Sequence, residues 1–443
     1  MAKKRYFQRN IDRELLLWSK DADRKVLLLR GARQVGKSSA VRNLGAGFRY
    51  FVEINFDDAD EQLKNLFQPG VSPQEICMQL SALTLTPIVP GETLLFFDEI
   101  QTCLPAILKL RYFYEQYPEL HVIAAGSLLE FALEEISSFG VGRISSLFMY
   151  PFSFDEFLSA SGKEMWVKAY TEASPENPLF EVLHKNILKL LQIFLLIGGM
   201  PAIVADFITN QDLLRCQRQL NDMLVSFRTD FVKYKKRVPS TRINEVFKSV
   251  AQQAEGKFVY EKASVQSSNR QIKDALELLI MAGLVYPVTH TAANGIPLGA
   301  EMNTKFQRMF LFDTGLFQRI LELNISNILL ADDFKTVNRG ALAEIFVALE
   351  LVKAASCYSP TSLYYWQREK SQSSAQIDFL VQRDDKIIPI EVKAGTIGKM
   401  QSMNLFLKEK HLEYGIRTSL ENFAKYDNIQ VYPLYAIGNI VKR

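Results

Sequence analysis

The feature that most constrains this chain is a glycine-rich turn placed directly after a short apolar run. Residues 26–30 read Val-Leu-Leu-Leu-Arg, which is typical of a strand buried on both faces. Residues 31–38 match the pattern G-x-x-x-x-G-K-[ST] at every defined position, and a helix-compatible stretch follows at 39–44. This order predicts a phosphate-binding loop between a strand and a helix of an α/β fold. A chance glycine-rich turn is the alternative, but it would leave the flanking strand and helix patterns unexplained.

The residue types inside the loop account for its spacing. Gly31 and Gly36 allow the backbone to turn so that consecutive N–H groups face one anion. Lys37 brings an ammonium group to the β- and γ-phosphates of a nucleotide, and the Ser38 hydroxyl is a ligand for Mg²⁺. The positive end of the following helix faces the same phosphates. The residues expected to hold the nucleotide are Gly31, Ala32, Arg33, Gln34, Val35, Gly36, Lys37, Ser38 and Ser39.

Strand-like and helix-like segments alternate after the loop. Residues 48–55, 92–99, 121–127 and 146–151 are predicted strands, and helical stretches such as 105–117 separate them. Such alternation gives right-handed βαβ units and a parallel sheet. The first part of the chain is therefore predicted to be an α/β P-loop NTPase core with a parallel sheet.

Two acids end one of these predicted strands. Asp98 can hold Mg²⁺ through water, and Glu99 can polarise an attacking water. Two solvated acids at a strand end are the alternative, which the upstream P-loop disfavours. Ser127 ends the following predicted strand and is expected to sense the γ-phosphate. Arg143 is a candidate cationic finger, in cis or from a neighbouring subunit, and a surface arginine is an equal alternative.

The pattern predicts four domains along the chain. Residues 1–150 form the P-loop core, and within them residues 5–20 are predicted to be a helix. Helical stretches follow from 151 to 234 and predict a helical lid. Residues 235–335 show helices and then a strand, an order that suits a winged helix, for which a structural role is favoured over DNA binding because few basic residues lie near. Residues 336–443 form a C-terminal α/β domain.

Acidic and basic residues recur in the C-terminal α/β domain. Residues 377–381 and 387–392 are predicted to form a hairpin, and Glu344 lies on a preceding helix. Glu391 and Lys393 share one face of a strand, and Asp378 can meet them from the paired strand. Two carboxylates and a lysine in this arrangement could hold Mg²⁺ and activate water for phosphodiester cleavage. A surface salt bridge is the alternative interpretation.

Composition excludes several other classes of protein. The 443 residues carry a net charge of +3, which neither requires nor excludes a nucleic-acid partner. The four cysteines and four histidines are scattered, which predicts reduced thiols in a cytoplasm and neither a disulfide framework nor a zinc site. The basic N-terminus has no apolar segment typical of a signal peptide. The most apolar window, 187–204, contains Lys189 and a Gly-Gly pair, so no membrane segment is expected.

Several of these motifs together resemble a known family. The P-loop, Phe97-Asp98-Glu99-Ile100-Gln101, Ala125-Gly126-Ser127, Gly142-Arg143 and the segment 150–158 resemble the prokaryotic AAA-type ATPases that carry a C-terminal domain of unknown function, DUF4143. The winged-helix-like stretch, Asp313-Thr314-Gly315-Leu316 and residues 340–395 resemble the C-terminal part of that family. The set Glu344, Asp378, Glu391 and Lys393 resembles the PD-(D/E)xK nuclease superfamily, although no proline precedes Asp378.

The resemblance implies binding and hydrolysis of ATP with Mg²⁺ in the cytoplasm of a bacterium or archaeon. One hypothesis is that the ATPase gates a metal-dependent nuclease that acts on DNA or RNA. The other is that ATP acts as a switch, and that the nuclease-like domain binds a protein or a nucleic acid without cleaving it. The superfamily commonly forms rings, so oligomers are expected alongside the alternative of a monomer.

Overall fold

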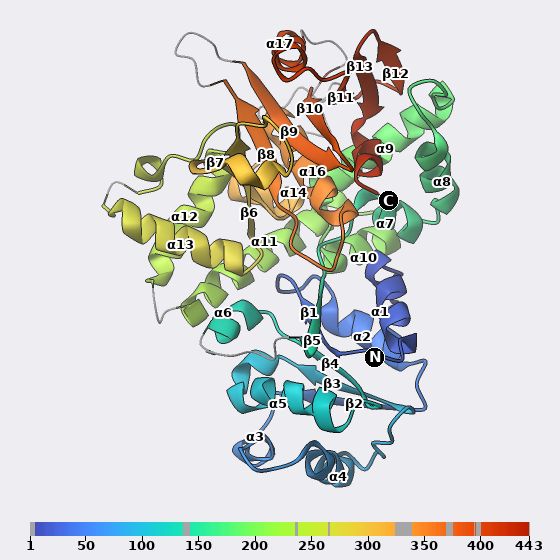
Figure 1. Ribbon diagram of the computed structural model, residues 1–443, viewed down its shortest axis with the longest axis vertical. Coiled ribbons are helices and arrows are strands. Elements are labelled where there is room, and N and C mark those ends of the chain that lie inside the picture. The colour runs from blue at the N-terminus through green and yellow to red at the C-terminus, as the bar shows by residue number, and fades with distance from the viewer. Residues whose placement is uncertain are drawn as a thin grey trace. The chain divides into compact units, whose positions relative to one another are not determined.

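The structure is a computed structural model, and it divides the chain into two units (Figure 1). Unit 1 comprises Met1–Pro151 and Ser356–Pro360, and unit 2 comprises Phe152–Ala355 and Thr361–Arg443. The residues that the structure describes are 5–134, 136, 142–234, 238–264, 266–323, 339–368, 375–393, 395 and 400–442.

Unit 1 is built on a five-stranded parallel sheet with the order β2-β3-β4-β1-β5. Its strands are β1 (Val26–Arg30), β2 (Tyr50–Asn55), β3 (Thr93–Asp98), β4 (His121–Ala125) and β5 (Ile144–Phe148). The prediction of an α/β parallel sheet is therefore confirmed. The central strands are mostly apolar and are buried along nearly their whole length, because helices cover both faces of such a sheet.

The helices of unit 1 separate its strands in the sequence. They are α1 (Asn10–Lys20), α2 (Lys37–Gly45), α3 (Glu61–Asn65), α4 (Pro73–Thr84), the short 3₁₀ helix η1 (Ile100–Thr102), α5 (Leu104–Gln116) and α6 (Leu129–Glu134). Helices α4 and α5 pack on one face of the sheet, where Ile76 and Leu110 meet Leu28 and Phe97 in one apolar core. Helix α2 also contacts β3 and β4, and its position follows from the P-loop that precedes it.

Unit 2 contains a mixed eight-stranded sheet with the order β12-β13-β11-β10-β9-β8-β6-β7. The strands are β6 (Val285–Thr291), β7 (Met302–Leu311), β8 (Leu363–Gln367), β9 (Gln376–Arg383), β10 (Lys386–Val392), β11 (Gly415–Ser419), β12 (Ala424–Tyr426) and β13 (Ile429–Pro433). Strands β9 and β10 pair antiparallel around a turn in which Asp384 has a φ of 54°. The predicted hairpin of the C-terminal domain is therefore confirmed.

The two strands β6 and β7 join this same sheet, which differs from the expected division into four domains. They form an antiparallel pair, and β6 lies parallel to β8 with Val288 opposite Leu363. The expected boundary between residues 335 and 336 therefore separates strands that share one sheet. The physical reason is that β9 pairs with one side of β8 and β6 pairs with the other, which satisfies the backbone groups of β8 on both sides.

Unit 2 also contains many helices, several of which contact its sheet. They are α7 (Phe154–Ala160), α8 (Glu164–Glu172), α9 (Glu181–Ile197), α10 (Pro201–Asn210), α11 (Leu213–Asp230), α12 (Ser240–Gln252), α13 (Asn269–Met281), α14 (Thr314–Ile320), α16 (Arg339–Ala354), α17 (Gln401–Lys410) and the 3₁₀ helices η2 (Phe231–Tyr234), η3 (Tyr260–Lys262), η4 (Leu298–Glu301) and η5 (Leu434–Ile440). Among the described residues, no helix combines the length and apolar content that a bilayer-spanning segment requires.

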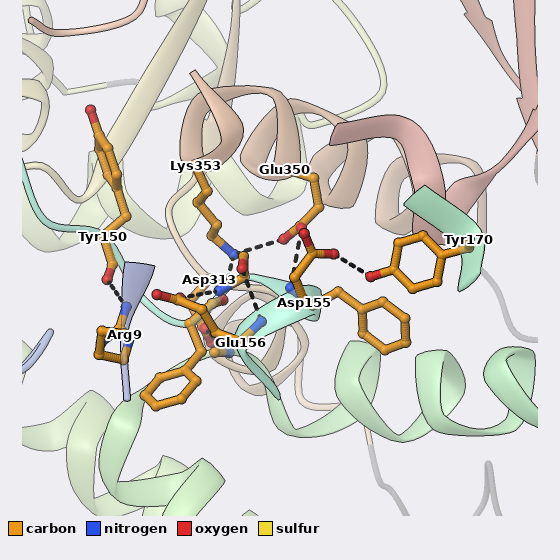
Figure 2. A network of polar contacts seen from close by, with 12 residues as sticks. Arg9, Tyr150, Asp155, Glu156, Tyr170, Asp313, Glu350 and Lys353 are labelled. Carbon is orange, nitrogen blue, oxygen red and sulfur yellow. Dashed lines mark hydrogen bonds and ion pairs between the residues drawn. The ribbon is translucent and has the colours of Figure 1, made fainter. Parts of the chain in front are cut away.

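A buried polar network fastens α16 to the first residues of unit 2 (Figure 2). The Phe154 N–H donates to Glu350 Oε2 at 3.1 Å. Lys353 Nζ donates to the Phe152 carbonyl at 2.9 Å and pairs with Glu350 Oε1 at 3.2 Å. Burial raises the pKa of Glu350 above its ordinary value, and the charge of Lys353 opposes that shift. A buried carboxylate is tolerated here because a cation and an N–H group compensate it.

Asp313 is a buried carboxylate of unit 2 that binds the turn at the end of α9. Its Oδ2 accepts the Gly199 N–H at 2.7 Å, and its Oδ1 accepts the Leu316 N–H at 2.9 Å as the cap of α14. Gly198 has a φ of 73°, and a Cβ at this position would overlap the Asp313 carboxylate. Gly198 is therefore required by the close approach of Asp313, whereas a Cβ on Gly199 would overlap the Phe152 carbonyl. Together the two glycines end the apolar helix α9 in a tight turn.

Candidate functional site

The glycine-rich loop joins β1 to α2 and has the backbone that the motif predicts. Gly31 and Gly36 have φ values of 138° and 102°, and Gln34 also lies in the left-handed region at 64°. A Cβ on Gly31 would overlap the Met149 carbonyl, so no other residue fits that position. The loop therefore curves before α2 begins at Lys37, and the first N–H groups of this helix are available to an anion.

Lys37 folds back over this loop. Its Nζ donates to the Gly31 carbonyl at 2.8 Å and to the Ala32 carbonyl at 2.9 Å. Burial lowers the pKa of Lys37 to about 8, although the nearby charges of Glu99 and Asp98 act in the opposite direction. The amine is thus poised beside the curved backbone, where a phosphate group could take it as a charged hydrogen-bond donor.

Ser38 and Asp98 meet at the end of β3. The Ser38 hydroxyl donates to Asp98 Oδ2 at 2.7 Å, and the Glu99 N–H donates to Asp98 Oδ1 at 3.1 Å. Burial raises the pKa of Asp98 above its ordinary value. A hydroxyl and a carboxylate side by side are oxygen ligands of the kind that Mg²⁺ takes, so the residues present fit the expected ion.

Glu99 and Ser127 come together from two adjacent strand ends. Glu99 Oε2 accepts the Ser127 hydroxyl at 3.1 Å and its N–H at 3.4 Å. Burial alone would raise the pKa of Glu99, but hydrogen bonds from Gln101 and Ser127 and the charge of Lys37 lower it overall. Glu99 also has a φ of 49°, a strained conformation for a non-glycine residue. The carboxylate is therefore held charged in one fixed place.

Gln101 is a functional residue that the sequence pattern did not single out. Its Nε2 donates to Glu99 Oε2 at 2.6 Å. A Cβ on Gly126 would overlap Gln101 Oε1, so Gly126 leaves the space that the amide occupies. Both residues stand in the motifs that carry the family resemblance, but only the fold brings them to the same carboxylate.

Arg143 lies at the end of the parallel sheet that is opposite the P-loop. It directly precedes β5 and forms an ion pair with Glu115 of α5. Strand β5 pairs parallel with β1, with Ile144 opposite Val26, whereas the P-loop follows the far end of β1. The five residues of β1 place these two ends of the sheet about 16 Å apart. The structure therefore does not bring Arg143 to the P-loop of its own chain, and a role in a neighbouring copy stays a prediction.

The acids of the nuclease-like set surround a buried arginine of β7. Arg308 is 1% exposed and forms an ion pair with Glu344 of α16. Arg308 Nη1 lies 3.7 Å from Asp378 Oδ1, and Asp378 Oδ2 also accepts the Val392 N–H at 2.9 Å. Burial lowers the pKa of Arg308 and the charge of Asp378 opposes that change. Sequence reasoning missed Arg308 because it lies outside the motif, on a strand assigned to another domain.

Glu391 and Lys393 form a separate pair beside these groups. Lys393 Nζ lies 2.6 Å from Glu391 Oε1, and burial raises the pKa of Glu391. Throughout the residues that the structure describes, no group of three or more His, Cys, Asp or Glu side chains is arranged to hold a metal ion. The four predicted residues thus lie in one region, but as two ion-paired sets and not as a carboxylate cluster open to Mg²⁺.

Sequence families match most of the chain in three segments. Residues 23–158 match a family described as an AAA domain. Residues 188–327 match a domain of unknown function, DUF8612, and residues 339–437 match another, DUF4143. The DUF8612 segment crosses the expected boundary between the helical lid and the winged helix. A comparison with curated proteins gives no match.

Solved structures with a detectable likeness are distant. A signal transduction ATPase with numerous domains from Pyrococcus horikoshii, with a tetratricopeptide repeat sensor, is 11% identical, with 79% of this chain and 46% of that chain covered and a TM-score of 0.28. The Holliday junction branch migration motor RuvB of Thermotoga maritima is 15% identical, with coverages of 63% and 88% and a TM-score of 0.24. The present chain thus spans about half the length of the first protein. At such TM-scores these likenesses carry no functional conclusion.

The five-stranded parallel sheet, the curved glycine-rich loop and the pair Ser38 and Asp98 define a P-loop NTPase fold. Together with the AAA and DUF4143 segments, they assign the chain to the AAA-type ATPases that carry a C-terminal DUF4143 domain.

A substitution at Gly126 tests the arrangement around Glu99. Alanine at this position would displace the Gln101 amide, since the Cβ takes its place. We expect Gly126→Ala to lower the kcat for ATP by about tenfold to a hundredfold, because a small displacement of a catalytic group has effects of that size. Nucleotide affinity should change little, because neither residue belongs to the P-loop. The assay is steady-state phosphate release.

Gly256→Ala is the matched control for this prediction. Gly256 does not have a positive φ, and nothing lies within 4 Å of a Cβ built there. Full activity in Gly126→Ala would show that the Gln101 amide is not needed to position Glu99.

Proposed function

We propose that unit 1 binds and hydrolyses ATP with Mg²⁺, and that its nucleotide state controls unit 2 as an interaction module. The observation that carries the ATPase part is the continuous line of contacts from Ser38 through Asp98 and Glu99 to Ser127. It joins the P-loop helix to two strand ends, so that a metal ligand, a base and a polar sensor adjoin one another.

Each residue of this line has a distinct part in the proposal. The P-loop N–H groups and Lys37 bind the phosphates, and Ser38 and Asp98 hold the ion. When bound, Mg²⁺ neutralises phosphate charge and orients the γ-phosphoryl group. Glu99 accepts the proton of the attacking water, and its lowered pKa keeps the carboxylate ionised at neutral pH.

In this proposal Ser127 senses whether a γ-phosphoryl group is bound. Its hydroxyl donates a hydrogen bond to Glu99, so a γ-phosphoryl group that interacts with either side chain changes this hydrogen bond. Arg143 remains a candidate for a cationic finger offered to a neighbouring copy, which would require an oligomer. That role is supported only by the exposed position of Arg143 at the end of the sheet opposite the P-loop.

Two functions are candidates for unit 2, and Arg308 favours binding without cleavage. Its guanidinium balances Glu344 and Asp378, two of the three carboxylates that a nuclease of this type would offer to a metal ion. A buried arginine in that place leaves less negative charge to attract Mg²⁺. We therefore favour a protein or nucleic acid as a ligand of unit 2 over a cleaved substrate. The pattern of Asp378, Glu391 and Lys393 keeps the nuclease as the second candidate.

ATP turnover by the purified protein is the first test. We expect turnover that is lost in Lys37→Ala, and stimulation by DNA, by RNA or by neither identifies the class of partner. Strand cleavage with Mg²⁺ or Mn²⁺ that is lost in both Asp378→Ala and Lys393→Ala would favour the nuclease. The absence of ATP binding by the wild-type protein would contradict the proposal.

Removing Arg308 tests whether this arginine keeps a metal ion away from Glu344 and Asp378. We expect Arg308→Met to gain thermal stability on addition of Mn²⁺, by a few degrees at saturation, because Glu344 and Asp378 lose their internal cation. Without added nucleotide, the wild-type protein should show no such shift. Arg308→Lys is the matched control, since it keeps a charge and should stay insensitive. Equal Mn²⁺ effects on all three proteins would contradict the prediction.

A further inference from the structure

Arg9 is a buried cation of unit 1 that reaches the P-loop from a distant part of the sequence. It immediately precedes α1 and is 6% exposed. Its Nη1 donates to the Val35 carbonyl at 3.1 Å, and its Nη2 donates to the Tyr150 carbonyl at 2.7 Å (Figure 2 shows the second contact). Both acceptors are backbone oxygens, so this cation fixes the path of the chain at two points.

The Val35 carbonyl belongs to the peptide plane that also contains the Gly36 N–H. In a planar trans peptide these two groups point in opposite directions. A hydrogen bond that fixes the Val35 carbonyl on one side therefore fixes the Gly36 N–H on the other. Gly36 does not fix this peptide plane by itself, because its φ is 102° and a glycine turns easily about that bond.

The Tyr150 carbonyl that accepts the second hydrogen bond of Arg9 is itself held in place. Tyr150 follows β5, and the preceding Met149 donates its N–H to the Arg30 carbonyl at 2.8 Å. Asp12 fixes the Arg9 backbone by accepting its N–H at 2.8 Å, and the Tyr6 hydroxyl donates to the same carboxylate at 2.7 Å. The guanidinium is therefore held from both sides before it meets the loop.

We propose that Arg9 is a positioning residue that orients the Gly36 N–H toward the phosphates of the bound nucleotide. This inference rests on the proposed ATP binding by the P-loop. Arg9 touches neither the reacting atoms nor the phosphates, and it acts through the Val35–Gly36 peptide. Its effect is on the binding of the phosphate chain, which both ATP and ADP possess, and not on the activation of water by Glu99.

The test compares Arg9→Met and Arg9→Lys with Arg13→Met in the full-length protein. Arg13 lies on α1 with an exposed side chain and serves as the matched control. We expect Arg9→Met to raise the KM for ATP and the Kd for ADP by about tenfold, the effect of losing hydrogen bonds from a charged donor. The kcat should change less than about threefold. Lysine can reach one of the two carbonyls and should restore part of the affinity.

A purely structural role would give a different pattern. Partial unfolding would lower the kcat in proportion to the active fraction and would leave the KM unchanged. A wild-type KM and ADP Kd in Arg9→Met would overturn the inference, and so would a wild-type KM in Arg9→Lys if the methionine variant does not fold. A wild-type protein that binds no ATP would instead overturn the proposed function.

Discussion

Glu99→Gln is expected to bind ATP normally and to lose turnover by about a hundredfold to ten-thousandfold, which is the usual contribution of a general base. The amide oxygen of glutamine can still accept the Ser127 hydroxyl, so the shape of the site should persist. The amide cannot take a proton from water at neutral pH. Equilibrium binding of a fluorescent ATP analogue and steady-state phosphate release measure the two effects separately.

Glu92→Gln is the matched control for this substitution. Glu92 lies just before β3, at the opposite end of that strand, where it pairs with Arg49 in solvent. The control should keep both binding and turnover within about twofold of the wild type, since exposed ion pairs contribute little. Normal turnover by Glu99→Gln would contradict the assignment of Glu99 as the base and would direct attention to another group near the γ-phosphate.

Local patterns predicted most of unit 1 because each signal lies within a few residues. An apolar run followed by a glycine-rich loop determines β1 and the P-loop together. The start of α7 in unit 2 shows the same kind of local signal, since Ser153 caps that helix and accepts the Glu156 N–H at 3.2 Å. Caps and loops of this kind depend on neighbours in the sequence, so a single sequence reveals them.

The contacts that complete the site join residues far apart in the sequence. Arg9 lies outside α1, which begins at Asn10 and not at residue 5 as the apolar pattern predicted, and this extended position lets its side chain reach Val35. Gln101 and Ser127 meet only because β3 and β4 are adjacent. Periodicity shows which face of an element is buried, but it does not show which element covers it.

Strand polarity explains the difference at Arg143. It precedes a strand that runs parallel to β1, whereas the P-loop follows β1, and the two therefore lie at opposite ends of adjacent strands. The arrangement of strands also explains why Arg308 was missed. Arg308 lies on β7, which joins the sheet through β6, and the pairing of β6 with β8 was not evident from the sequence. In both cases the position of the side chain depends on the order and polarity of the strands, which periodicity does not show.

Lys37→Ala is expected to weaken ATP binding by about a hundredfold or more, which corresponds to roughly 3 kcal/mol for the loss of a buried charged donor to phosphate. The wild-type amine already lies over the loop, bonded to the Gly31 and Ala32 carbonyls, so little reorganisation precedes binding. Lys20→Ala, an exposed substitution at the end of α1, is the control and should bind ATP as the wild type does. Isothermal titration calorimetry gives both affinities.

The same lysine predicts how ATP affinity depends on pH. Burial lowers the pKa of Lys37 to about 8, Glu99 and Asp98 raise it, and Arg33 lowers it. Below pH 8 the amine is already charged, so affinity should be constant. Above pH 8 each binding event must take up one proton, because the phosphates are fully ionised and require the ammonium form. Affinity should therefore fall about tenfold between pH 7 and pH 9.

Proton uptake provides an independent measurement of this linkage. At pH 9 the observed binding enthalpy should differ between buffers of different ionisation enthalpy, whereas at pH 7 it should not. An affinity that is constant from pH 7 to pH 9 would show that Lys37 is charged throughout this range. Burial of the amine would then be offset by Glu99 and Asp98, and the free loop would already carry the positive charge that receives the phosphates.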